Sequence, residues 1–113
     1  MEYTYQQRIA MMRILLDIIH ADGVIHSRET FFFNELKQVF ELSDSDKEMV
    51  EEKNSLLALA QIKAFTKEQK NHFAELMAKM IVVDDDINPN EIEIYNIVRD
   101  FCLIEKGFDA NVS

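Results

Sequence analysis

The chain has 113 residues, of which 48% are hydrophobic, with only 2 Gly and 1 Pro and a formal net charge of −9. This length fits one domain with a single core, and so few turn-forming residues argue against a β-sandwich or barrel and for an all-α fold. The negative charge argues against nucleic acid and anionic lipid as partners and favours cations or basic proteins, because a phosphate-binding surface is basic.

The single cysteine, Cys102, leaves no internal disulfide and suits a reducing compartment. It lies in an apolar stretch that predicts a buried, unreactive thiol. No apolar run approaches the roughly 18 to 20 residues that a membrane-spanning helix needs. Glu2, Gln6 and Arg8 also interrupt the start of the chain, where a secretory signal would be apolar. We therefore expect a cytoplasmic protein without membrane insertion.

The first predicted helix runs from about Thr4 to Ala21, where apolar residues repeat at helical spacing in two adjacent stripes. An apolar arc this wide predicts a central helix that several others cover. The two stripes consist of Tyr5, Ile9, Met12, Leu16 and Ile19, and of Met11, Leu15 and Ile18.

The second predicted helix runs from Ser27 to about Glu41 and carries three consecutive phenylalanines, Phe31 to Phe33. Successive helical residues point about 100° apart, so the three rings cannot all face one core. Phe31 is the one expected to be exposed, because the repeat described below pairs it with Glu93. Two interpretations remain open: Phe31 covers a crevice beneath another helix, or it contacts a protein partner or a second copy of the chain.

Four further helices are predicted, and the last two begin with clear start signals, Thr66 with Gln69 and Asn88 with Pro89. Six helices with short connections indicate a compact all-α helical bundle. We expect one domain over residues 1–104 and a frayed tail over residues 105–113. The four helices are expected to begin near Ser45, at Ser55, at Thr66 and at Pro89, and to end near Lys53, Ala64, Val83 and Ile104.

Two acidic stretches organise the chain, and both have the pattern Asp-x-x-Ile-x-x-x-Glu. One runs from Asp22 to Glu29 and the other from Asp84 to Glu91, 62 positions later. The same offset aligns the flanking helices, which indicates an internal duplication of a helix–acidic loop–helix unit. Under it Phe32 aligns with Ile94, Phe33 with Tyr95, Asn34 with Asn96, Leu36 with Val98, Lys37 with Arg99 and Val39 with Phe101.

A purely structural interpretation explains most of this motif. Acidic residues in a first helical turn cap backbone N–H groups and suit the helix dipole, and Glu29 and Glu91 stand at that place. Gly23 supplies a positive φ for the turn, and Asp85 replaces it in the second copy. Ile25 and Ile87 are then expected to be buried and to hold each loop against the core.

A site for a divalent cation, calcium or another, is the alternative. If Glu29 is placed at position 12 of an EF-hand loop, Asp22 falls at position 5 and Ile25 at position 8. Positions 1 and 3 lack ligands in both copies, so neither loop alone suffices. If the duplication packs with pseudo-twofold symmetry, however, the two loops can pool their oxygens. The candidate metal ligands are then Asp22, Glu29, Asp84, Asp86 and Glu91.

An enzyme is the weakest hypothesis. His20, Asp22 and His26 flank the first loop and could hold a transition metal. The second copy has Val82 and Asn88 at the equivalent positions of the two histidines, and no nucleophile or glycine-rich phosphate loop stands out. We therefore expect a protein that is not an enzyme.

The loop with its entry, Ala21 to Glu29, resembles the TerB-like family associated with tellurite resistance. The resemblance extends over most of the chain through the second copy. It implies an all-helical fold of two similar halves, no catalytic activity and a role in bacterial stress response, with metal proposed to bind at Asp22, Glu29, Asp84 and Glu91. The sequence departs from the family pattern at Asp85, where glycine is expected, and at His26.

Overall fold

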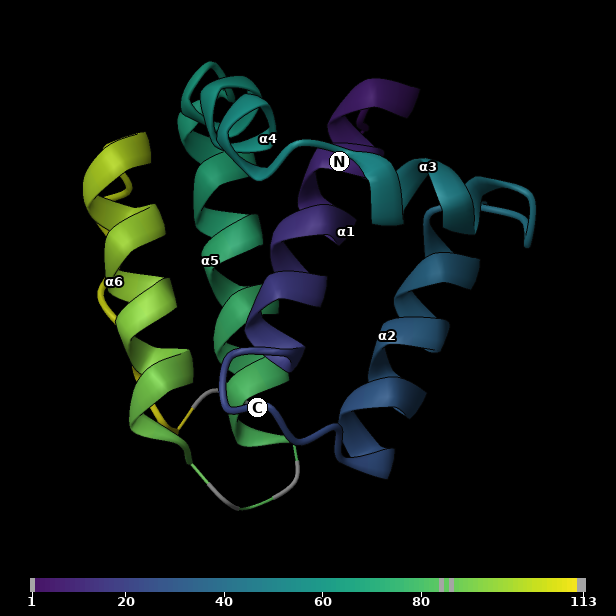
Figure 1. Cartoon of the computed structure of the whole chain (residues 1–113). Coiled ribbons are helices and arrows are strands. Elements are labelled where there is room, and N and C mark those ends of the chain that lie inside the picture. Colours follow the sequence, from purple (N-terminus) through teal and green to yellow (C-terminus); the bar gives the residue numbers. More distant parts are fainter. Residues whose placement is uncertain (1, 84, 86, 112–113) are drawn as a thin grey trace.

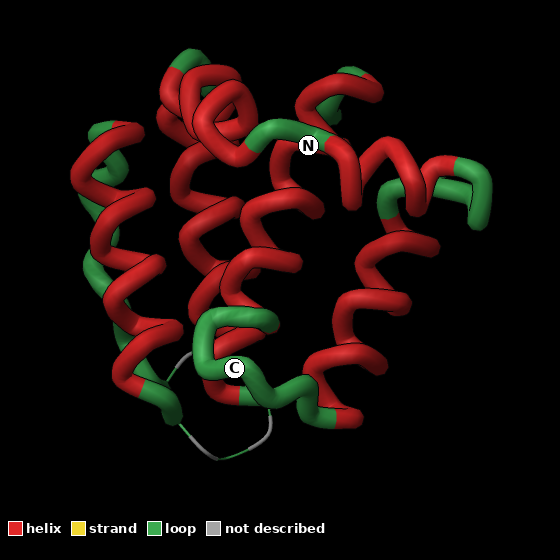
Figure 2. Tube along the Cα trace, viewed as in Figure 1, coloured by secondary structure: helices red, strands yellow, loops and turns green. Residues whose placement is uncertain are grey.

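The computed structural model describes residues 2–83, 85 and 87–111, which contain six helices and no strand. The all-α prediction is confirmed, and each helix begins and ends within a few residues of its expected position (Figure 2). The helices are α1 (Tyr5–Ile19), α2 (Ser27–Val39), α3 (Asp46–Glu52), α4 (Ser55–Lys63), α5 (Lys67–Val82) and α6 (Pro89–Cys102).

Helix α1 is the centre of the bundle and contacts each of the other five helices. It lies between α2 on one side and α5 and α6 on the other (Figure 1). Eight of its residues are buried, which fits the wide apolar arc in its sequence. The two helix–loop–helix units are α1 with α2 and α5 with α6, as the duplication predicts.

The duplication extends to the way in which the helices start. Thr4 and Gln7 form a capping box at the start of α1, and Thr66 and Gln69 form the same box at the start of α5. In each box the threonine hydroxyl accepts the backbone N–H of the glutamine. The side-chain oxygen of the glutamine in turn accepts the backbone N–H of the threonine. The two threonines are 62 positions apart, and so are the two glutamines, so the caps are equivalent in the two copies.

The ends of α2 and α6 are also equivalent. Glu41 and Leu103 both adopt the left-handed conformation, with φ of 57° and 59°. The next residue in each copy donates its N–H back into the helix, Leu42 to Lys37 and Ile104 to Arg99, at 2.9 Å in both. This is the Schellman closure, in which a buried apolar residue follows the left-handed one.

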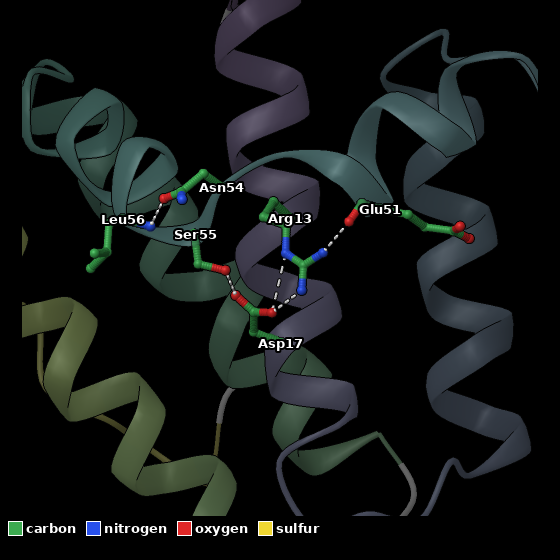
Figure 3. Close-up of polar contacts among 6 residues, drawn as sticks. All are labelled: Arg13, Asp17, Glu51, Asn54, Ser55 and Leu56. Carbon is green, nitrogen blue, oxygen red and sulfur yellow. Dashed lines mark hydrogen bonds and ion pairs between the residues drawn. The ribbon is translucent and has the colours of Figure 1, made fainter.

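A polar cluster joins α1 to the connector between the repeats (Figure 3). Asp17 forms an ion pair with Arg13 and accepts a hydrogen bond of 2.6 Å from the Ser55 hydroxyl. Arg13 also donates to the backbone carbonyl of Glu51 at 2.7 Å, and Asn54 caps α4 by accepting the N–H of Leu56. The charged residues of α1 therefore position the segment between α3 and α4.

Helix α2 is attached mainly at its two ends. Only Glu29 and Leu36 of its residues are buried. At its start Arg28 contacts Asp85 in the second acidic loop at 2.9 Å. Beyond its end Arg8 of α1 donates to the carbonyl of Phe40 at 2.6 Å. Between the two ends, Leu36 is buried and Phe32 and Phe33 pack partly against the core, whereas the remaining side of the helix, with Phe31 and Glu35, is exposed.

Part of the tail that was expected to be frayed makes specific contacts. It runs back along α6 (Figure 1), where the Tyr95 hydroxyl donates to the carbonyl of Lys106 at 2.9 Å. The ring of Phe108 packs edge-on against that of Tyr95, and Lys106 pairs with Glu75 of α5 at 3.0 Å. Within the part of the chain that the structure describes, no helix is long and apolar enough to cross a membrane.

Candidate functional site

The two acidic loops have a left-handed residue at equivalent positions. Gly23 has φ +77° and donates its N–H to His20, while Asp85 has φ +64° and donates to Val82. The two turns are again 62 positions apart. Asp85 thus takes the left-handed role expected of it in place of glycine, which aspartate tolerates better than most residues.

The loops also lie next to each other, as pseudo-twofold packing of the repeats requires. The Asn88 amide donates to Asp22 Oδ2 at 3.3 Å, and Arg28 pairs with Asp85 at 2.9 Å. Each contact joins one copy of the motif to the other. The sequence interpretation treated Asn88 only as a helix cap, which it also is, since it accepts the N–H of Asn90 at 2.8 Å.

Glu29 and Glu91 are the only charged residues that are buried among those described, at 0% and 1% exposure. Both stand in the first turn of a helix, 62 positions apart. Glu29 Oε1 accepts the backbone N–H of His26 at 3.3 Å, the bond expected of a capping glutamate. Its other oxygen, Oε2, is buried and has no hydrogen-bond partner among the described residues.

Asp22 is half-buried and its two oxygens have separate roles. Oδ1 accepts the N–H of Val24 at 2.9 Å and stabilises the turn. Oδ2 faces the Asn88 amide and lies 3.6 Å from Nε2 of His26. Asp22 is therefore held in place by both loops, with its second oxygen on the side of the other copy.

The structure thus describes only some of the predicted metal ligands. Asp84 and Asp86 lie outside the described residues. Among the residues that are described, no three His, Cys, Asp or Glu side chains gather closely enough to hold an ion, so Asp22, Glu29 and Glu91 alone do not form such a group. By the same finding His20, Asp22 and His26, the ligands considered for an enzyme, do not form a group of three, although His26 lies 3.6 Å from Asp22.

The two loop isoleucines correct one expectation. Ile25 is 58% exposed and Ile87 is 40% exposed, so neither is the buried anchor that the capping interpretation required. Ile25 stays uncovered because α2 lies away from α1 at this point. The loops are held by polar contacts to each other instead.

Phe31 is 67% exposed, which agrees with the prediction that this ring faces away from the core. Val39, two turns further along α2, is 70% exposed on the same side of the helix. Neither the Phe31 ring nor the Val39 side chain covers a crevice beneath another helix. Whether this surface contacts a partner is a separate question, taken up below.

Comparison with known proteins shows the fold alone. No family model matches the chain, and no curated protein matches it. Among solved structures, the protein of unknown function PG1108 from Porphyromonas gingivalis W83 is similar with a TM-score of 0.77. The match covers 97% of this chain and 86% of that one at 19% sequence identity. Another protein therefore has the same helical architecture.

Proposed function

We propose that the chain is a small non-enzymatic binding module of the TerB-like type whose paired acidic loops hold a divalent cation. The observation that carries the proposal is Glu29 Oε2, a buried carboxylate oxygen without a hydrogen-bond partner among the described residues. A buried charge is costly unless it is paired, and a cation is the most direct partner for it.

The arrangement around Glu29 supports this proposal. Asp22 lies half-buried between the loops, and the Asn88 amide and Arg28 tie one loop to the other. Glu91 occupies the equivalent position in the second copy and is equally buried. Oxygen donors from both copies therefore lie at the same end of the bundle.

The donors favour a hard cation. Carboxylates and an amide suit Ca²⁺, Mg²⁺ or Mn²⁺, whereas Zn²⁺ prefers imidazole and thiolate. We therefore expect calcium or manganese to bind more strongly than zinc. The site would be structural and regulatory, without a reaction assigned to it.

The test is thermal unfolding of chelator-treated protein with each cation added, together with titration calorimetry. At a concentration of 100 times Kd, a bound ion stabilises by about 2.7 kcal/mol, which raises Tm by roughly ten degrees or more in a domain of this size. Glu29→Gln should abolish the rise. Glu35→Gln, a change at an exposed glutamate of the same helix, should preserve it.

The direction in which Glu29→Gln changes the stability of the protein without metal is also informative. Glu29→Gln removes a buried charge, so the chelated variant should be at least as stable as the chelated wild type. A chelated variant that is less stable than the chelated wild type, in a protein whose melting temperature no cation changes, would identify Glu29 as a cap and nothing more. The absence of any cation-dependent shift in the wild type would refute the proposal.

A structural interaction domain is the second candidate, and the 67% exposure of Phe31 favours it. In this case the acidic residues only cap helices, as the Glu29 bond to His26 and the Asn88 bond to Asn90 allow. Sedimentation velocity of wild type and Phe31→Ser tests it. Self-association that is lost in the variant, with helicity unchanged, would support this function.

A further inference from the structure

A groove of about 460 Å³ opens between α1, α2 and α3. Its apolar walls are formed by residues about one turn apart, such as Met12, Leu16 and Ile19 on α1 and Phe33 on α2. Ile25 of the first acidic loop lines one end, and Val50 of α3 lines the other. A volume of this size and an apolar lining are typical of ligand sites.

The second repeat shows what fills the equivalent space there. Tyr95 of α6 aligns with Phe33 of α2, and Tyr95 is fully buried while Phe33 is only half-buried. The difference is the tail, whose Phe108 ring covers Tyr95. Lys106 beside it pairs with Glu75 on α5. The tail thus places an aromatic residue against α6 and, two positions before it, a lysine against α5.

In the first repeat the chain leaves α2 for α3 instead of returning along the helix (Figure 1), so the corresponding space stays open. We propose that it is a docking groove for an extended segment of a partner protein that carries an aromatic side chain flanked by basic residues. The inference rests on the protein's being a binding module, and it does not require the cation.

The charge of the groove supports a basic occupant. The segment from Glu41 to Glu52, which borders the groove, contains six carboxylates and one lysine. The two lysines that line the groove already have partners within the chain, since Lys37 pairs with Asp44 at 2.5 Å and Lys47 with Glu51 at 3.9 Å. The excess acid at the border therefore attracts cationic residues of a partner.

The experiment uses a fluorescein-labelled short peptide with a central phenylalanine flanked by lysines, titrated with the full chain in fluorescence anisotropy. A second peptide, with serine in place of phenylalanine, has the same charge. We expect it to bind at least about tenfold more weakly, because a buried aromatic anchor dominates such interfaces. Equal binding of both peptides would mean attraction by net charge alone and would overturn the proposal.

Variants locate the binding site. Asn34→Trp places a large side chain from an exposed position on the groove lining and should weaken binding at least about tenfold. Gln38→Trp, at an exposed position of the same helix outside the groove lining, should leave binding unchanged. Glu51→Lys should weaken binding at low salt more than Glu93→Lys on α6. Wild-type affinity in Asn34→Trp would overturn the proposal.

Two other occupants of the groove can be distinguished from a partner segment. A dimer of the wild type that Asn34→Trp dissociates in sedimentation would assign the groove to a second copy. A small apolar molecule that co-purifies with the wild type but not with Asn34→Trp, seen by native mass spectrometry, would assign it to such a ligand. Either result overturns the proposal. The peptide titration, repeated in chelator and in calcium, is read beside the melting experiment. Peptide binding by a protein whose melting temperature no cation changes would refute only the metal site.

Discussion

Cys102 is fully buried, and its thiol lies 3.4 Å from the carbonyl oxygen of Leu59. Burial raises the pKa of the thiol to about 11. Because the thiolate is the reactive form, we expect native protein at pH 8 to react with a disulfide reagent at least about a hundredfold more slowly than protein in denaturant. Absorbance of the released thiolate measures both rates. A fast native reaction would mean that α6 opens readily.

His72 of α5 lies stacked on Tyr3, with the hydroxyl 2.7 Å from Nδ1 of the imidazole. Burial lowers the pKa of His72 from 6.5, and the nearby Glu75 opposes the shift. The folded state therefore binds the proton less well than the unfolded chain does. The stabilisation is complete above pH 6.5 and is lost as the pH falls below that value.

His72→Gln tests this dependence. The free energy of unfolding of the wild type should decrease more steeply between pH 7.5 and pH 5.5 than that of the variant, as measured by urea unfolding at several pH values. All other ionisable groups are the same in the two proteins, so the difference between the curves isolates His72. Parallel curves would show that protonation of this imidazole costs the fold nothing.

At the scale of the helix, the residue that ends α2, Glu41, can be tested by substitution. It adopts φ 57° directly after α2, a conformation that glycine accepts without strain. Glu41→Gly should raise the free energy of unfolding by about 1 kcal/mol. Glu35→Gly, at an exposed glutamate in the middle of the same helix, should lower it by about 1 kcal/mol. Chemical unfolding of both variants measures the pair, and changes of equal sign would contradict this account.

The helices and the duplication could be predicted from the sequence because their signals are local. Apolar periodicity placed α1, and the capping residues near Thr66 and Asn88 placed the starts of α5 and α6. The offset of 62 positions aligned the two loops and implied that they could meet if the repeats pack with pseudo-twofold symmetry. The contact between Asn88 and Asp22 joins the two loops.

Features that depend on the distance between helices were missed. Periodicity shows which side of a helix is apolar, but not whether another element covers that side. Ile25 was therefore expected to be buried, and the groove beside it was not foreseen. The contacts of Phe108 with Tyr95 were missed for the same reason, since residues after α6 have no periodicity to interpret.

For the molecule as a whole, the attachment of α2 predicts uneven local stability. Helix α2 buries few of its residues and is held mainly near its ends. A segment of this kind unfolds locally at a lower free energy than the whole protein does. We expect the amides in the middle of α2 to exchange with deuterium well before those of α1 and α5. Exchange followed by mass spectrometry checks the order, and equal protection of α2 and α1 would contradict it.

The equivalence of α2 and α6 has a consequence for how this chain tolerates change. Both helices begin and end in the same way, but α6 has Tyr95, Val98 and Cys102 buried and lies beneath its own tail, whereas α2 has little core to maintain. A substitution on α6 disturbs buried packing, whereas one at an exposed position of α2 disturbs less of the core. The second copy of the unit thus carries more of the architecture, and the first leaves more of its surface free to vary.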